Sequence, residues 1–379
     1  MTNRKMRPGI KITLIFGILF ITGLIMLPKH VLRYFYWNYA DLNDYQKFPS
    51  VPVKKGDSTF YFAELPTNSS LQIPGKYLLG KENPSFENFL EAKKTVAFLV
   101  IKNDTLIYEK YFDNYSDTSI IPSFSVSKPF VSALVGIAID EGKIKSTRVP
   151  ITDFLPELTN PGFEKITIED LLNMRSGIDY NEGYSNPLGH MAKFYYGTDL
   201  KKYLKKLNTK EFSGKRYDYV SVNALLLSLI VEQATNMKIN KYLEQKIWQP
   251  IGMESDATWS IDSEASQTIK SFCCINAIAR DFARFGRLYL KKGNWEGRQV
   301  ISESWIKRST SIINDSRDSQ GYPYTYQWRV LPNGSFFAKG VMGQYVLVYP
   351  DKNLIFVRMG HGYADIDWAD FCIELSKAL

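Results

Sequence analysis

The sequence predicts a mixed α/β protein of the α+β kind, in which strands from both ends of the chain form one antiparallel sheet flanked by helices. Two observations predict this class. β-rich runs occupy residues 96–112 and return over 325–359, and the interval between them has mainly helical patterns. We therefore expect a helical subdomain, inserted at about residues 146–275, in a main domain that spans 81–379. With 379 residues, of which 45% are hydrophobic, the chain can bury a sizeable core.

The first 28 residues have the pattern of a membrane anchor. A run from Ile12 to Leu27 carries no charge, and four basic residues precede it whereas two follow it closely. This asymmetry predicts a cytoplasmic N-terminus over residues 1–11, one transmembrane helix over 12–28, and a main body outside the cytoplasm, on the periplasmic or extracellular side. A cleaved signal peptide is the alternative, but no small-residue cleavage site follows Leu27. Residues 29–80 mix proline, glycine and polar residues with short apolar pieces, which predicts an extended stalk or linker.

The elements of the main domain follow in order. Two apolar runs over 96–112 flank Lys102-Asn103-Asp104-Thr105, which is a hairpin signal. Helical patterns then occur at 168–174, 224–234 and 277–290. Near the end, an antiparallel meander is predicted by runs at 325–331, 335–338, 344–349 and 354–359, which turn sequences separate. A final helix has one apolar face made of Trp368, Phe371, Cys372, Leu375 and Leu379.

Composition and charge exclude several classes of function. The formal net charge is +8, but the basic residues are scattered and no nucleic-acid motif accompanies them, so we expect no nucleic-acid partner. Cys273, Cys274 and Cys372 have no metal-ligand spacing and imply no disulfide framework, and we interpret them as core residues. The sequence holds no metal-ligand set and no phosphate-binding loop, so we expect neither a metal nor a cofactor.

The segment from Pro122 to Phe130 predicts a reactive serine at the start of a helix. Pro129 has no N–H, and its ring would clash with a helical carbonyl four residues earlier, so it must lie in the first turn. Ser125 then lies at or just before the N-cap, among unpaired backbone N–H groups. Lys128 returns to the same helix face, where it could remove the proton that a serine hydroxyl must lose to become a nucleophile.

The Ser-x-x-Lys pattern alone is weak, because a second copy runs from Ser304 to Lys307. There, Ser302 followed by an acidic residue predicts the start of a helix, with Trp305 packed inward. We expect this second copy to be structural.

Further blocks of sequence single out the first copy, and they lie in the order 125–128, 166–177, 214–219 with 226–232, 279–286 and 326–328. From about Phe86 to the C-terminus, the chain resembles the class C β-lactamase-like, or penicillin-recognising, serine hydrolases. It is most similar to their 6-aminohexanoate-dimer hydrolase and carboxylesterase branch. The resemblance implies hydrolysis of an ester or linear amide through an acyl-enzyme on Ser125.

The same resemblance implies roles for further residues. Tyr219 would transfer protons together with Lys128. Val341, which follows Gly340, would give its backbone N–H to an oxyanion hole shared with the N–H of the nucleophile. Tyr184 resembles a pocket tyrosine that contacts the scissile amide in that branch.

Two departures from the family pattern bear on the substrate. Ser221 stands where the family usually has an asparagine that holds a substrate carbonyl, and Ala338 stands where a cation is usual, with Lys339 next to it. Both departures disfavour β-lactam recognition, so we expect a small-molecule ester or amide as the substrate.

Other functions stay open at this point. The chain could be a catalytically silent, membrane-tethered protein that binds an envelope ligand with the same fold, or a β-lactamase or DD-peptidase. A Ser-His-Asp site is disfavoured, because neither His190 nor His361 accompanies a Gly-x-Ser-x-Gly sequence.

Overall fold

The computed structural model of the chain describes residues 27–78 and 84–379. The expected cytoplasmic N-terminus over 1–11 and nearly all of the expected transmembrane helix over 12–28 lie outside these residues. Among the residues described, no helix combines the length and the apolar character needed to cross a membrane.

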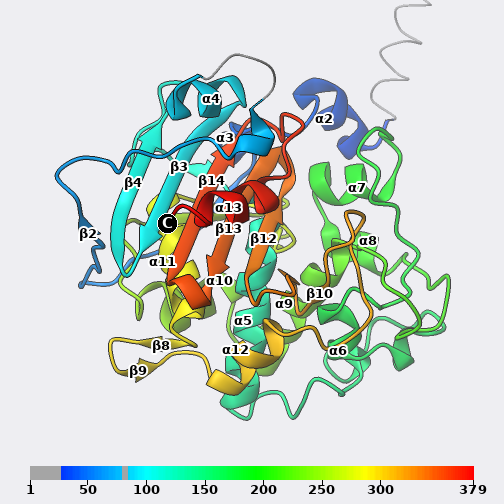
Figure 1. The fold of residues 1–379 in the computed structure, drawn as a ribbon. Coiled ribbons are helices and arrows are strands. Elements are labelled where there is room, and N and C mark those ends of the chain that lie inside the picture. Colours follow the sequence, from blue (N-terminus) through cyan, green and yellow to red (C-terminus); the bar gives the residue numbers. More distant parts are fainter. Residues whose placement is uncertain (1–26, 79–83) are drawn as a thin grey trace, which may run out of the picture.

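An eight-stranded sheet forms the centre of the molecule, with strand order β10-β11-β12-β13-β14-β3-β4-β2 (Figure 1). Neighbouring strands are antiparallel except for β2 and β4, which run parallel. The prediction of one mainly antiparallel sheet built from both ends of the chain is therefore confirmed. The strands are β2 (Ala63–Glu64), β3 (Thr95–Lys102), β4 (Thr105–Tyr111), β10 (Tyr324–Thr325), β11 (Trp328–Val330), β12 (Phe336–Gly340), β13 (Gln344–Tyr349) and β14 (Leu354–Gly360).

Strands β3 and β4 form the predicted hairpin. Its turn residues, Asn103 and Asp104, have φ angles of 51° and 60°. A two-residue turn of this kind needs positive φ at both positions, which Asn and Asp adopt more readily than other non-glycine residues. Along its other edge β3 pairs with β14, with Lys102 opposite Leu354, so the two ends of the chain meet in the middle of the sheet.

Helices cover both faces of this sheet (Figure 1). On one face, α11 (Ala279–Leu290) contacts β3, β13 and β14, and its Gly286 allows close approach because a Cβ there would lie 3.0 Å from Ile355. On the other face, α4 (Phe86–Ala92) and the predicted C-terminal helix α13 (Trp368–Ser376) bury an aromatic cluster around Phe371. Coverage of both faces explains why nearly all of β3 is buried.

A helical subdomain lies beside the sheet. Its buried helix α9 (Val222–Thr235) packs against α5 (Ser127–Asp140), which carries the predicted nucleophile segment at its start. The expected insertion at about 146–275 is mainly helical, but it ends in a strand, β6 (Ala257–Ser260). The other helices here are α6 (Ile168–Leu172), α7 (His190–Tyr196), α8 (Leu200–Leu204), α10 (Ile239–Leu243), a π-helix at Glu244–Trp248, and the 3-10 turns Ile151–Asp153 and Phe163–Lys165.

The described residues of the expected stalk, 29–78, belong to the folded body, which differs from the sequence-based expectation. Strand β1 (Ser50–Val53) pairs with β6 in a second sheet of order β1-β6-β7-β5. Phe48, Val53 and Phe62 are each at most 6% exposed. These apolar residues are separated by prolines and polar residues, so the sequence shows no periodic pattern there. Each of them is nevertheless buried in the core. The segment also holds α2 (Lys29–Trp37), α3 (Asp44–Lys47) and a 3-10 turn at Gly75–Tyr77.

The remaining elements are short. They are β5 (Ile121–Pro122), the 3-10 turn Phe124–Val126, β7 (Ile275–Ala277), the β8–β9 hairpin (Asn294–Trp295 and Arg298–Gln299), α12 (Glu303–Ser309), and the 3-10 turns Val341–Gly343 and Pro350–Lys352.

Candidate active site

Ser125 and Lys128 meet at the start of α5, as the sequence predicts. The α-helix begins at Ser127 with Val126 as its N-cap, so Ser125 lies in a 3-10 turn just before the cap, and Pro129 lies in the first turn. The Nζ atom of Lys128 is 2.8 Å from the Oγ atom of Ser125. Lys128 is only 1% exposed. This contact is a hydrogen bond in which the amine and the hydroxyl can exchange a proton.

The backbone turns sharply to present Ser125. The preceding residue, Phe124, has φ of 43°, in the left-handed region that a bulky side chain rarely adopts. Its ring is nevertheless only 2% exposed, so packing in the core stabilises the strained turn. Between Ile121 and Ala138, Ser125 is the one residue that is not buried. Its hydroxyl therefore faces the outside of an otherwise closed core.

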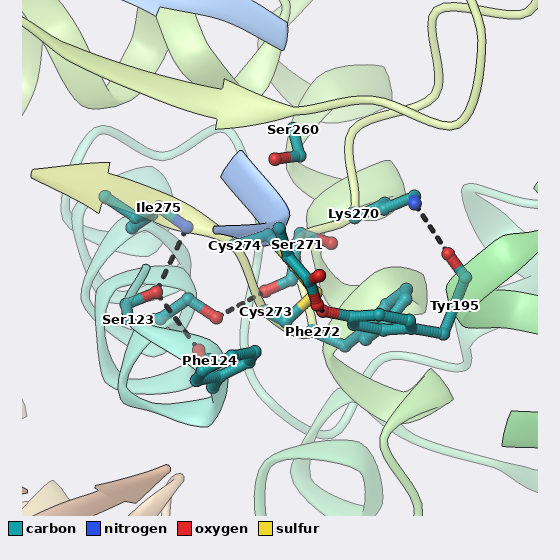
Figure 2. The surroundings of a disulfide bond; sticks show 12 residues. Ser123, Phe124, Tyr195, Ser260, Lys270, Ser271, Phe272, Cys273, Cys274 and Ile275 are labelled. Atoms are coloured by element: carbon teal, nitrogen blue, oxygen red, sulfur yellow. Dashed lines mark hydrogen bonds between the residues drawn. A yellow bond between two sulfur atoms is a disulfide. The ribbon is translucent and has the colours of Figure 1, made fainter. Parts of the chain in front are cut away.

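Backbone carbonyls of the loop before β7 hold Lys128 and its neighbour Ser127. Figure 2 shows this loop, from Lys270 to Cys274. The Nζ of Lys128 donates a second hydrogen bond to the carbonyl O of Phe272, at 2.7 Å. The hydroxyl of Ser127 donates to the carbonyl O of Ser271, at 3.1 Å. Because each partner is a backbone carbonyl, the loop can orient the lysine without supplying a charge.

The same loop contains a disulfide between the adjacent residues Cys273 and Cys274 (Figure 2). The sequence implies no disulfide framework, so this pairing corrects the interpretation of both cysteines as simple core residues. Both are buried, and Cys274 has φ of 74°. Neighbouring cysteines carry no framework signal, because their pairing closes no loop of the chain. Cys372 is a buried free thiol in α13, as expected.

Tyr219 lies beside this pair. The Nζ of Lys128 is 5.2 Å from the centroid of the Tyr219 ring. The Cζ of Arg329 lies 5.8 Å from the centroid of the same ring, and Arg329 forms an ion pair with Asp318. The Tyr219 ring therefore lies close to both the amine of Lys128 and the guanidinium of Arg329. The sequence gives no signal for Arg329.

Gly340 brings strand β12 against the nucleophile turn. A Cβ at this position would lie 2.7 Å from the carbonyl O of Ser123 and 3.2 Å from the Cβ of Phe124, so a larger residue would push the strand away. Val341 follows directly and lines the same pocket as Ser125. Strand β12 therefore packs directly against the turn that carries Ser125.

Ser221 is held by a carboxylate that the sequence did not reveal. Its N–H donates to Oε2 of Glu182 at 3.0 Å, and its hydroxyl donates to Oε1 of the same residue. Burial raises the pKa of Glu182, while the charge of Lys128 and the hydrogen bonds from Ser221 oppose that rise. Glu182 lies in a loop with no motif around it, so only the fold brings it to the site.

The third-motif region has no cation in the usual place. Ala338 is 1% exposed, and Lys339 donates to the side-chain carbonyl of Gln320 and lies 4.8 Å from the centroid of the Tyr363 ring. Burial and the nearby Arg329 lower the pKa of Lys339 to about 8. Lys339 is therefore engaged with these neighbours.

A pocket opens at Ser125. It also contains the predicted site residues Tyr184, Ser221 and Val341, whereas Lys128 and Tyr219 are not among its lining residues. Its lining comes from the N-terminal segment, helix α7, the loop at 270–275 and the nucleophile turn. The lining residues are Tyr34, Tyr39, Ala40, Phe124, Ser125, Tyr184, Met191, Ala192, Tyr195, Tyr196, Ser221, Phe272, Cys273 and Val341.

Other candidate chemistries lack a site in the described parts of the chain. Across residues 27–78 and 84–379, no cluster of three or more His, Cys, Asp and Glu residues could hold a metal ion. His361 is paired with Asp113, its Nε2 at 2.8 Å from Oδ2, and the Nδ1 of His190 accepts from the N–H of Asn181. Neither histidine contacts Ser125.

Comparison with known proteins decides the family. The chain matches the Beta-lactamase family over residues 86–365. It belongs to this family. As a member, it is a serine hydrolase, and the resemblance inferred from its sequence blocks is confirmed.

Proteins similar to this chain include other hydrolases. The chain is 29% identical over 299 residues to 6-aminohexanoate-dimer hydrolase of Paenarthrobacter ureafaciens, which covers 73% of this chain and 75% of that protein. A structure of a candidate 6-aminohexanoate-dimer hydrolase from Bacillus anthracis has a TM-score of 0.79 at 22% identity, over 91% of this chain and 94% of that one. EstCE1, a hydrolase with promiscuous acyltransferase activity, has a TM-score of 0.62 at 14% identity, over 77% and 95%. The two structural likenesses concern the fold alone.

Proposed function

We propose that the protein hydrolyses an ester or a linear amide through an acyl-enzyme on Ser125. The observation that carries the proposal is the 2.8 Å contact between Ser125 Oγ and the buried Nζ of Lys128, which the carbonyl of Phe272 orients. A serine needs such an adjacent base to act as a nucleophile. Ser125 is also the residue of its segment that reaches the surface of the core, where a substrate can meet it.

The reaction proceeds in two halves. Ser125 Oγ attacks the carbonyl carbon while its proton passes to Lys128 Nζ. The oxygen of the tetrahedral intermediate accepts hydrogen bonds from the N–H groups of Ser125 and Val341, and Gly340 permits that close approach. The bond to the leaving group then breaks, and Tyr219 returns a proton to that group with Lys128. Water attacks the acyl-serine by the reverse sequence and releases the acid.

Two pocket residues complete the proposal. Tyr184 is 44% exposed at the edge of the pocket, where its phenol can contact the scissile group of a bound substrate. Ser221, fixed by Glu182, replaces the amide that would hold a β-lactam carbonyl. We therefore expect activity on esters first and on β-lactams last.

The test compares purified protein with its Ser125→Ala variant on a 4-nitrophenyl ester, and labels both with a fluorophosphonate probe. We expect the variant to lose at least about 10³-fold in kcat/KM and to remain unlabelled, since Ser125 is the pocket hydroxyl that contacts the amine of Lys128. Hydrolysis by the variant at the rate of the parent protein would reject the assignment.

We also infer that the chain is tethered to a membrane, with the hydrolase outside the cytoplasm. Support comes from the charge-free run 12–27 with its excess of preceding basic residues, and from Phe35 and Tyr36 in α2, which are 69% and 84% exposed. Alkaline extraction of membranes from cells expressing the full chain tests this inference. Release of the protein into the supernatant would contradict it.

A further inference from the structure

We propose that the segment 34–40 is part of the substrate site and that the pocket beside Ser125 takes an uncharged, apolar group next to the scissile bond. The inference rests on the proposed function and names the substrate class for the same site. It assigns a binding role to a part of the chain that precedes the family match at residues 86–365.

The segment 34–40 lies at the pocket that contains Ser125. Tyr34, Tyr39 and Ala40 line the same pocket as Ser125 and Val341. Helix α2, which contains Tyr34, contacts α7, which supplies the opposing lining (Figure 1). A substrate group that enters the pocket from Ser125 is therefore enclosed between the N-terminal segment and α7.

Hydrogen bonds and ring contacts hold the segment 34–40 in place beside the pocket. The phenol of Tyr34 donates to the carbonyl O of Tyr184 at 3.1 Å, and its ring centroid is 5.6 Å from that of Tyr196 in an edge-to-face arrangement. The phenol of Tyr196 donates in turn to the carbonyl O of Asn38. These contacts tie the segment to α7 at several points, so the pocket exists before a substrate binds.

The pocket lining carries no charged side chain. Most of the lining side chains are aromatic or aliphatic. The charged groups that contact lining residues are already engaged within the protein: Lys128 by Ser125, Glu182 by Ser221, Asp44 by Tyr195 and Lys47, Lys270 by the carbonyl O of Tyr195, and Arg33 by the carbonyl O of Tyr196. A substrate group that carries an ammonium or a carboxylate would lose its hydration there without a free counter-charge, whereas an alkyl group would gain from burial.

The first experiment measures charge selectivity of the full chain with two pairs of esters matched in length. One pair differs on the acyl side, 4-nitrophenyl hexanoate against 4-nitrophenyl 6-aminohexanoate, and the other on the alcohol side, hexyl acetate against 6-aminohexyl acetate. In at least one pair we expect kcat/KM to be at least about tenfold higher for the uncharged ester, because the pocket offers no partner to the ammonium. Equal or better hydrolysis of the charged ester in both pairs would overturn the proposal.

The second experiment asks whether the N-terminal segment sets chain length. Ala40→Phe fills the pocket, so we expect kcat/KM to fall about tenfold for the longer uncharged ester of the preferred series and less than about twofold for its acetyl or methyl counterpart. Tyr39→Ala, at a position 60% exposed, should shift preference the other way. Ala63→Phe, at an exposed position in β2, is the matched control and should change neither.

The outcomes separate the two proposals. Loss of all ester hydrolysis in Ser125→Ala, together with no charge selectivity in the full chain and unchanged length preference in the Ala40 and Tyr39 variants, would reject only the pocket assignment. Persistence of hydrolysis in Ser125→Ala would reject the proposed function itself.

Discussion

The chain contains the same four-residue pattern twice, and the two copies differ in almost every physical respect. Lys128 is buried, and its amine contacts Ser125 and a backbone carbonyl. Lys307 is exposed on α12, and the hydroxyl of Ser304 bonds to that of Ser302. The second copy starts a helix with Ser302 as its N-cap and Trp305 buried at 5% exposure, as predicted. The copies therefore differ in the burial of the lysine and in the strained turn before the serine, and these two features support the proposal of Ser125 as the nucleophile.

The largest expected difference between the copies concerns the lysines. Lys128→Met keeps the length of the side chain and removes the amine, so we expect kcat/KM for a 4-nitrophenyl ester to fall by about 10³-fold or more. Lys307→Met should stay within about twofold of the parent protein, because exposed side chains far from the site rarely matter. Similar losses in both variants, at equal thermal stability, would remove the distinction.

A smaller loss of activity is expected from a substitution in strand β12, which packs against the turn that carries Ser125. Gly340→Ala places a Cβ 2.7 Å from the carbonyl O of Ser123, which moves the N–H of Val341 away from the nucleophile. Loss of one oxyanion donor costs about 10²-fold in kcat, and we expect a decrease of that size. Gly75→Ala, whose Cβ would meet no atom within 4 Å, is the control. Full activity of Gly340→Ala would show that this approach is not needed.

The third prediction concerns pH and the carboxylate behind Ser221. Burial raises the pKa of Glu182 above its ordinary value of 4.5, so the folded protein binds this proton more tightly than the unfolded chain. Its contribution to stability is then full at low pH and decreases as pH rises from that ordinary value through the raised pKa. Glu182→Gln does not titrate. Urea unfolding of both proteins from pH 4.5 to 8 should show the parent protein losing stability relative to the variant. An unchanged difference would contradict the buried environment of Glu182.

The smallest effect is expected at the second copy. Ser302→Ala removes the side chain that accepts the N–H of Trp305, at 3.4 Å, and loss of an N-cap costs about 1 kcal/mol. Thermal unfolding should therefore occur at a slightly lower temperature, while ester hydrolysis stays the same. A change in kcat would connect α12 to the site and weaken the contrast with Ser125.

The sequence predicted those elements of the fold that are encoded by residues close together in the chain. Alternation and turn residues located the hairpin at Asn103 and the C-terminal meander, and the covalent restriction of Pro129 placed the helix start. The segment 29–78 was interpreted as a stalk, because single buried residues such as Val53 pair with β6, about two hundred positions later, and leave no periodicity in the sequence.

The site residues, too, fall into a group that the sequence predicted and a group that only the structure revealed. Side chains within recognisable blocks, including Ser221 and Val341, do line one pocket with Ser125. Three features of the site were not predictable from the sequence: the carbonyl of Phe272, the carboxylate of Glu182 and the position of the segment 34–40 at the pocket. A backbone carbonyl has no residue signature, and the other two come from segments that only tertiary packing brings to the pocket.

The pairing of β3 with β14 also constrains how the protein is made. Strand β3 leaves the ribosome early, but its partner along one edge ends only at Gly360. During synthesis, β3 therefore has no partner along the edge that later pairs with β14. An apolar strand with an unpaired edge is prone to associate with other chains. Closing so distant a contact also slows folding. We infer that chains that terminate before β14 aggregate, so that the last strand of the sheet acts as a check on complete synthesis.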